Sequence, residues 1–199
     1  MKTTLLIASY NSDKLREIKA ILQNIPVALK SLFDVGITDI IKETGQNYHQ
    51  NAQIKAEYAG RKTGLLTLAE DSGLEIDELS GKPGIYSARF AGGSDADRNK
   101  IILAQLKGVP VEKRTARFIC VVALYDAKSE KTYFFKGESR GWITEKPLGR
   151  AGFGYDPVFF NKDLKKTNAQ ASRQEKNRES HRARALLKVK KFLLRSYAV

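Results

Sequence analysis

The order of hydrophobic and polar positions along the chain predicts strands alternating with helices. The apolar run within Thr3–Ser9 is typical of a first strand. Leu15, Ile18 and Ile21 then recur at helical spacing, which predicts a helix from about Ser12 or Asp13 to Gln23. Two further helices are expected, at about Tyr48–Arg61 and from about Asp95 or Asp97 to Leu106.

The second half of the chain changes to a β pattern before a final helix. Arg117–Tyr125 and Lys131–Lys136 are expected to form neighbouring antiparallel strands, linked near Asp126–Lys128. The last helix should begin after Ser180, a good N-cap residue, and should bury Leu186, Val189 and Leu193. The chain therefore has the pattern of an α/β protein.

Two adjacent acids, Glu70 and Asp71, are the first candidates for chemistry. Gly64–Leu68 resembles a short strand, so both carboxylates should emerge in a loop at its carboxyl end, where ligands of open α/β sheets gather. Adjacent acids in a loop can hold Mg²⁺ and orient an attacking water. The alternative is a solvated turn.

Composition limits the class of protein. The 199 residues, 42% of them hydrophobic, are enough for one domain spanning 1–199, with room for two lobes. A secretory signal or membrane span is not expected, which predicts a soluble, cytoplasmic protein. Cys120, the single cysteine, lies in a β-like run and is expected to be a buried structural thiol. With only His49 and His181 besides it, a zinc site of the usual kind is not expected.

The net charge of +13 indicates attraction to polyanions without identifying them. Much of the excess follows Lys162, where it is either a ligand surface or simply the solvated face of a helix. We expect charge reversals at Lys190 and Lys191 to leave an enzymatic activity unchanged.

Two segments offer positive charge near a helix start. Between Ile7 and Lys14 a strand turns into a helix, which creates a natural phosphate cradle with Lys14 one turn in, although the glycines of a Walker A loop are missing. Glu43 precedes a helix that carries Lys55, and Glu43 could be a second metal ligand. An ordinary capped helix, an exposed acid and a surface lysine are the simpler interpretations.

Two other segments are rich in glycine. Gly81–Arg89 is a turn that delivers Arg89, which suits either a phosphate or a structural salt bridge. In Gly149–Phe160, aromatics between glycines could stack on a flat base and Asp156 could accept hydrogen bonds, or the segment is a turn with core aromatics. Lys176 and the triplet Ser180–Arg182 follow near a helix start.

Taken together and in order, these segments resemble the inosine triphosphate pyrophosphatase family, over nearly the whole chain. The matching segments are Ser9–Lys14, Glu43–Gly45 with Asn51, Ala52 and Lys55, Asp71–Leu74, Gly81–Arg89, Phe153–Pro157 and Ser180–Arg182. Each one is a weak signal, whereas all of them in family order are specific.

The resemblance implies an elongated α/β fold with a twisted mixed sheet, flanking helices and two lobes around a nucleotide cleft, assembled as a homodimer. It also implies Mg²⁺-dependent hydrolysis of non-canonical purine nucleoside triphosphates, such as ITP, dITP and XTP, to the monophosphate and pyrophosphate. No stable complex with nucleic acid and no association with membranes are expected.

Site residues follow from the resemblance position by position. Asp71 would be catalytic and would share the metal with Glu43. Substrate would be bound at the triphosphate by Ser9, Asn11 and Lys14, with Lys55 and Arg89 assisting, and elsewhere by Ser72; the base pocket would comprise Phe153, Gly154, Tyr155, Asp156, Lys176, His181 and Arg182.

Some positions depart from the family pattern. Glu70 replaces the first aspartate of a commoner Asp-Asp-Ser-Gly, Gln50 replaces a glutamate, and Tyr10 and Asp13 stand where small residues are frequent.

Three alternatives stay open: a nucleic-acid-binding protein, a related Maf-like pyrophosphatase with another base preference, and a catalytically inert protein of the same fold.

Overall fold

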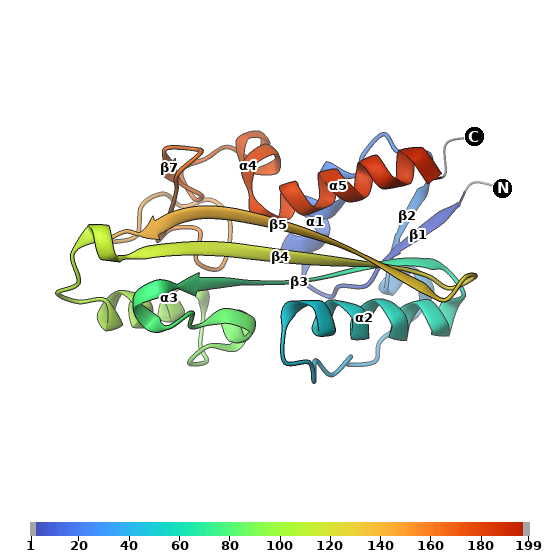
Figure 1. The fold of residues 1–199 in the computed structure, drawn as a ribbon, viewed down its shortest axis with the longest axis horizontal. Helices are drawn as coiled ribbons and strands as arrows, with labels where there is room; N and C mark the ends of the chain where they lie inside the picture. The colour runs from blue at the N-terminus through green and yellow to red at the C-terminus, as the bar shows by residue number, and fades with distance from the viewer. Residues whose placement is uncertain (1–2, 197–199) are drawn as a thin grey trace. The chain divides into compact units, whose positions relative to one another are not determined.

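The computed structural model describes residues 3–196 and confirms the α/β class. The strands are β1 Thr4–Ile7, β2 Ala28–Ser31, β3 Leu66–Ile76, β4 Thr115–Asp126, β5 Lys131–Ile143, β6 Phe159–Asn161 and β7 Lys166–Thr167. The α-helices are α1 Ser12–Ile21, α2 Tyr48–Thr63, α3 Asp95–Gln105, α4 Arg173–Glu179 and α5 His181–Ser196 (Figure 1). Short 3₁₀ turns are η1 Phe33–Val35, η2 Asp77–Leu79, η3 Gly84–Arg89 and η4 Val111–Lys113.

One mixed sheet holds the seven strands in the order β2-β1-β3-β4-β5-β6-β7. β1 runs parallel to both β2 and β3, whereas β6 is antiparallel to both β5 and β7. β4 and β5 are neighbours in the sheet and are joined by residues 127–130 alone. Adjacent strands with so short a connection form an antiparallel hairpin, as the sequence predicts.

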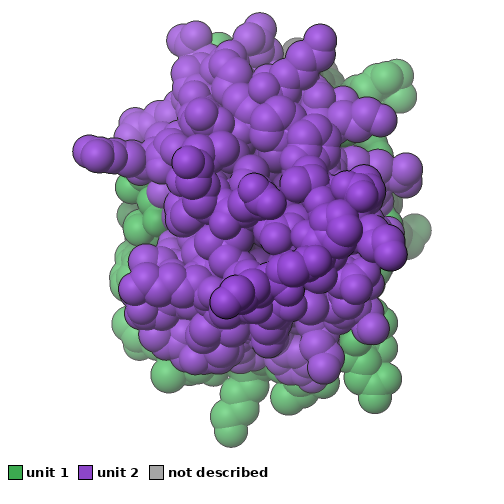
Figure 2. Space-filling model, turned by 90° about the vertical axis from the view of Figure 1, so that its left-hand side faces the viewer, with its two compact units in different colours: residues 1–71, 120–137, 182–199 green, residues 72–119, 138–181 purple. Residues whose placement is uncertain are grey.

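Contacts divide the chain into two compact units, coloured separately in Figure 2. Unit 1 comprises the described residues up to Asp71, together with Cys120–Gly137 and those from Arg182 onward; unit 2 comprises Ser72–Ile119 and Glu138–His181. Strands β3, β4 and β5 each contribute residues to both units.

The core of unit 1 explains where its helices lie. Alternate residues of β1 and β3, such as Leu5, Ile7 and Leu68, pack with α1 and with the buried face of α5. As predicted, that face of α5 carries Leu186, Val189 and Leu193. The opposite face of the sheet meets α2, where a Cβ added at Gly60 would lie 2.3 Å from the Tyr125 ring. Figure 1 shows α5 and α2 on the two sides of the strands.

The core of unit 2 is formed on α3 and the outer parts of the long strands. Its buried residues include Ile102, Phe118, Ile143, Tyr155 and Phe159. The helix boundaries follow the capping signals, since Ser94 and Ser172 each form a capping box at the start of α3 and α4.

One expectation about β3 is wrong. The strand does not stop at Leu68 but continues to Ile76, so Glu70 and Asp71 lie inside a strand rather than in a loop. The apolar residues Leu74 and Ile76 are fully buried in the core of unit 2 and continue the strand beyond the acids. The parallel neighbour of β3, β1, ends where Ile7 pairs with Leu68. Glu70 and Asp71 therefore lie just beyond the end of β1.

No helix of the described residues is both long enough and apolar enough to cross a membrane.

Candidate active site

Two faces of β3 carry the two acids of the candidate site, both within unit 1. Because side chains alternate along a strand, Glu70 continues the face of Leu66 and Leu68, whereas Asp71 continues the face of Thr67. The adjacent carboxylates therefore point to opposite sides of the sheet. A single ion held by both acids, one of the two interpretations of the sequence pattern, does not fit this geometry.

Glu70 lies on the side of α1 and α5, where its side chain is fully buried within an ionic cluster. Its Oε1 is 2.7 Å from Lys14 Nζ and 3.2 Å from Arg182 Nη2, and its Oε2 accepts a hydrogen bond from the Cys120 thiol at 3.0 Å. Burial raises the pKa of Glu70, but Arg182 and Lys14 outweigh burial and hold this pKa well below its usual range. The carboxylate is therefore charged and bound to protein groups through both oxygens.

Arg182 completes this cluster from the first turn of α5. Its side chain is 2% exposed, and its Nη1 lies 2.6 Å from Glu17 Oε2. The guanidinium thus joins an acid of α1 to Glu70. Cys120 is the buried thiol that the sequence predicts, and burial and the nearby Glu70 keep its pKa well above the usual value.

Asp71 lies on the side of α2. Asn51 Nδ2 donates to its Oδ2 at 3.1 Å, and Lys55 Nζ lies 3.7 Å from its Oδ1. Residues four apart on a helix share one face, which is why both α2 side chains reach the same carboxylate. Burial raises the pKa of Asp71 despite the opposing effect of Lys55.

Glu43 joins this second group through Lys55, whose ammonium forms a short ion pair with the Glu43 carboxylate. Burial lowers the pKa of Lys55, but Asp71 and Glu43 outweigh burial, so the pKa is raised and the ammonium stays charged. One ammonium thus lies within ion-pair distance of both predicted metal ligands.

The donor set suits a magnesium ion that is also bound by substrate. Among residues 3–196 no three side chains of His, Cys, Asp or Glu are grouped as a metal cage. Mg²⁺ does not need such a cage, because it typically uses one or two carboxylates and takes its other ligands from phosphates and water. Glu43 and Asp71 are the two carboxylates that the sequence prediction assigns to such an ion, and both contact Lys55.

The turn before α1 positions Lys14. Asn11 is the N-cap of the helix, and its side chain accepts a hydrogen bond from Lys14 N at 2.9 Å. Ser9 Oγ accepts from Asn11 N at 3.3 Å. The predicted phosphate cradle is thus an ordered helix start, with Lys14 directed at Glu70.

In unit 2, Asp156 organises the glycine-rich segment. Its carboxylate accepts hydrogen bonds from Phe153 N at 2.9 Å and Asn168 Nδ2 at 3.1 Å, and it pairs with Lys176. Lys176 Nζ lies 4.7 Å from the centre of the Phe153 ring. Gly152, with φ +79°, leaves room for the carboxylate, since a Cβ there would lie 2.1 Å from Asp156 Oδ2.

The other predicted residues of unit 2 differ in their burial and contacts. Tyr155 donates its hydroxyl to Ser87 O at 2.8 Å, and burial raises the pKa of Tyr155 to about 12. His181 is buried and stacks on Phe118, with ring centroids 4.5 Å apart. Gly154 O accepts from Asn99 Nδ2 at 3.1 Å. Arg89 is exposed at the end of η3, over the Tyr86 ring, and Ser72 is half-buried in β3.

Sequence reasoning missed several partners of these residues. Glu17, Cys120, Asn168 and Asn99 contact the candidate residues, but only the folded chain brings them there. For Asn51 the sequence does contain a usable signal, namely its spacing of four from Lys55 on a predicted helix.

Comparison with known proteins gives a consistent picture. The model of the Ham1 family matches residues 5–192. The dITP/XTP pyrophosphatase of Bacillus subtilis (strain 168) is 45% identical over 190 residues, which are 94% of this chain and 96% of that protein. The dITP/XTP pyrophosphatase of Geobacter sulfurreducens is 46% identical over 193 residues, covering 96% of each.

Solved structures agree with the sequence comparisons. A HAM1 protein from Coxiella burnetii superimposes with a TM-score of 0.89 at 36% identity, covering 98% of this chain and all of that one. The Staphylococcus aureus Ham1 protein gives a TM-score of 0.85 at 35% identity, covering 96% and 98%.

Proposed function

Since the chain belongs to the Ham1 family, we propose that it is a nucleoside triphosphate pyrophosphatase that hydrolyses non-canonical purine nucleotides, dITP and XTP among them, to the monophosphate and pyrophosphate. The observation that carries this proposal is the pair of buried charge clusters on the two faces of β3. A buried cation beside a fixed carboxylate, repeated on both faces, is an arrangement that can bind and polarise phosphate groups.

Asp71 is the residue that we assign to the attacking water. Asn51 fixes the orientation of its carboxylate, which would orient or deprotonate the water. Glu43 and Asp71 would hold Mg²⁺, which when bound would neutralise charge on the phosphates.

Two lysines would stabilise negative charge that develops on the leaving pyrophosphate. Lys14 is held at the start of α1 by Glu70, and Lys55 is held on α2 by Glu43 and Asp71. Both ammonium groups are thus oriented before substrate arrives, which is the condition under which fixed charges lower a barrier most.

Other parts of the proposal rest on the resemblance alone. Phe153 and Lys176 of unit 2 would contact the purine base, and a homodimer and a cytoplasmic location stay predictions. An in-line attack by water needs no covalent nucleophile. His181 would bind substrate rather than act as a general base, because it lies beside Arg182 at the start of α5.

The decisive experiment identifies the phosphate product. Purified protein incubated with ITP and Mg²⁺ should release inosine monophosphate and pyrophosphate in equal amounts, and a chelator should abolish turnover. The reaction should be followed by ion-exchange chromatography after removal of contaminating pyrophosphatase. Release of orthophosphate alone would contradict cleavage between the α and β phosphates.

A further inference from the structure

A pocket within unit 2 contains none of the candidate active-site residues. It has a volume of about 440 Å³ and is lined mainly by β4, β5 and the residue after β6. This volume falls in the range of roughly 300–1,000 Å³ that is typical of small-molecule sites. The lining side chains that bear on its chemistry are Asp77, Thr115, Arg117, Arg140, Trp142 and Lys162.

An aromatic platform forms one part of the pocket. Trp142 pairs with Phe160 across β5 and β6, and the two rings stack with centroids 4.2 Å apart and planes 17° from parallel. Gly141 permits this close pairing, because a Cβ there would lie 1.8 Å from Phe160 O. The indole, itself only half-buried, is therefore a rigid, flat surface on which another ring could stack.

Basic side chains form another part. Arg117 is held by Glu75, which accepts from Nε at 2.9 Å and lies 2.8 Å from Nη2, and Arg140 is held by Glu138, which accepts from its Nε at 2.7 Å. Neither glutamate lines the pocket. Arg117 is thus oriented from outside the pocket, whereas Arg140 is a largely exposed side chain, and both have Nη nitrogens that can donate to a ligand.

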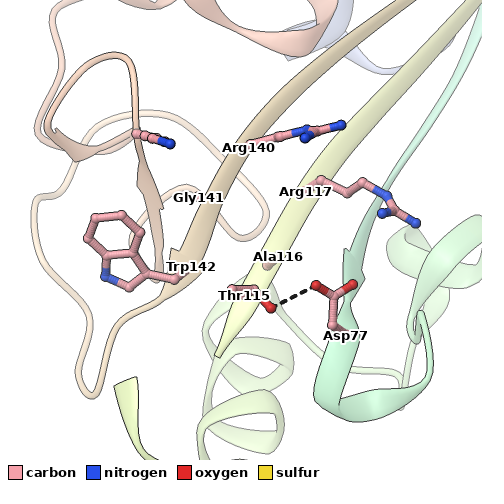
Figure 3. Close-up of a pocket in the computed structure, with 8 residues that line it drawn as sticks. Asp77, Thr115, Ala116, Arg117, Arg140, Gly141 and Trp142 are labelled. Atoms are coloured by element: carbon pink, nitrogen blue, oxygen red, sulfur yellow. Dashed lines mark hydrogen bonds between the residues drawn. The ribbon is translucent and has the colours of Figure 1, made fainter. Parts of the chain in front are cut away.

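The labelled charged groups of the pocket lie together, since Asp77 is on the same side of the view in Figure 3 as Arg117 and Arg140. Figure 3 shows the guanidinium groups of Arg117 and Arg140 extending in the same direction, with the Trp142 indole on the other side of the view. The Thr115 hydroxyl donates to Asp77 Oδ2 at 2.7 Å and orients that carboxylate. Three basic residues and one acid line the pocket, so it favours an anion that also offers a hydrogen-bond donor.

We propose that this pocket is a second, non-catalytic site for a nucleoside 5′-phosphate. The base would stack on Trp142, the phosphate would bind Arg140, Arg117 and Lys162, and Asp77, on the arginine side of the pocket, would accept a hydrogen bond from a hydroxyl of the ligand. The same chemistry is offered by a free mononucleotide and by a nucleotide within single-stranded nucleic acid.

Trp142 makes the proposal directly measurable, because it is the only tryptophan of the chain. Its fluorescence should be quenched in a saturable way when adenosine 5′-monophosphate is added to the full-length protein in the presence of a chelator. Adenosine, which lacks the phosphate, should bind at least about tenfold more weakly. Equilibrium dialysis with labelled mononucleotide provides a second measurement that does not depend on the indole.

Matched variants separate this site from the active site. Arg140→Ala combined with Lys162→Ala should weaken binding by about tenfold. The control is Lys107→Ala with Arg173→Ala, which removes the same charge from exposed positions of unit 2 outside the pocket and should leave affinity unchanged. Lys14→Ala, which affects only the active-site cluster, should also leave it unchanged.

A short oligoadenylate identifies the source of the ligand. Stronger binding of the mononucleotide supports a site for free nucleotides, and stronger, salt-sensitive binding of the oligonucleotide supports a nucleic-acid contact. The proposal is overturned by the absence of saturable binding in both measurements, by equal binding of adenosine and its monophosphate, or by binding lost in Lys14→Ala but kept in the pocket variant.

Discussion

Asp71 and Glu70 are neighbours in the chain, but the alternation of a strand gives them different surroundings. Asp71 meets one lysine and one amide, and burial dominates, so its pKa is raised. Glu70 meets Lys14 and Arg182 together, and these cations outweigh burial, so its pKa is lowered. Adjacent positions of β3 thus carry carboxylates whose pKa values are shifted in opposite directions, and the two residues can be tested separately.

Replacement of Asp71 should separate activity from stability. Asp71→Asn keeps the shape but removes the charge, so kcat/KM for ITP should fall at least about a hundredfold. Stability at neutral pH should be unchanged or higher, because folding raises the pKa of Asp71 and its ionisation above pH 3.8 therefore opposes folding. Steady-state kinetics and urea unfolding of one preparation test both parts. A variant that is inactive because it is unfolded would contradict the assignment.

Replacement of Glu70 should act in the opposite way on stability. Glu70→Gln leaves Arg182 and Lys14 without their shared anion, so unfolding at pH 7 should become about 3–5 kcal/mol easier. Folding lowers the pKa of Glu70, so its stabilisation is present above pH 4.5 and is lost as the pH falls below that value. The difference between the wild-type protein and the variant should therefore shrink in urea titrations below pH 4.5. A difference independent of pH would argue against a charged Glu70.

At the scale of elements, the sequence predicts most helices and the positions of the long strands because their signals are local, although β5 continues to Ile143 beyond the expected end at Lys136. Asn11 and Asn47 cap α1 and α2, and the apolar spacing of α5 matches its buried face. The length of β3 could not be predicted, because local rules assign adjacent acids to turns. The side chains that compensate the burial of Glu70 and Asp71 are distant from these acids in the sequence, namely Lys14, Lys55 and Arg182. For the same reason the two separate clusters of the site could not be derived from motif order.

Neighbouring lysines of α5 should contribute unequally to stability. Lys190 Nζ donates to Ile21 O at 3.3 Å and to Gln23 O at 2.8 Å, so it caps carbonyls at the end of α1. Lys190→Ala should lower the free energy of unfolding by about 1 kcal/mol. Lys191→Ala, its exposed neighbour, should change it by less than about 0.5 kcal/mol. Equal effects in denaturant titrations would show that the capping contact is energetically unimportant. Of the two lysines whose charge reversal should leave activity unchanged, only Lys191 is therefore a control without a structural contact to α1.

At the scale of the whole molecule, the two charge clusters of unit 1 do not account for the net charge of +13. Those clusters nearly balance internally, since Lys14 and Arg182 face Glu70 and Glu17, and Lys55 faces Glu43 and Asp71. The excess therefore lies elsewhere, and it favours polyanionic ligands in general. Charge alone does not select a base, so selectivity has to come from hydrogen bonding.

The base selectivity of the intact enzyme is the corresponding prediction. Inosine and xanthosine carry an oxygen at purine position six, whereas adenine carries an amino group, and the predicted base-binding residues include Lys176, a hydrogen-bond donor. An unmatched buried donor costs about 1–3 kcal/mol, or roughly five- to 150-fold per contact. Guanine keeps the six-oxo group, so its rejection must arise at the two-amino position, through crowding or a missing acceptor. ITP and XTP should therefore have kcat/KM values at least about a hundredfold above those of ATP and GTP, measured at one pH with one metal ion. Comparable values for all four nucleotides would leave only a general nucleotide pyrophosphatase.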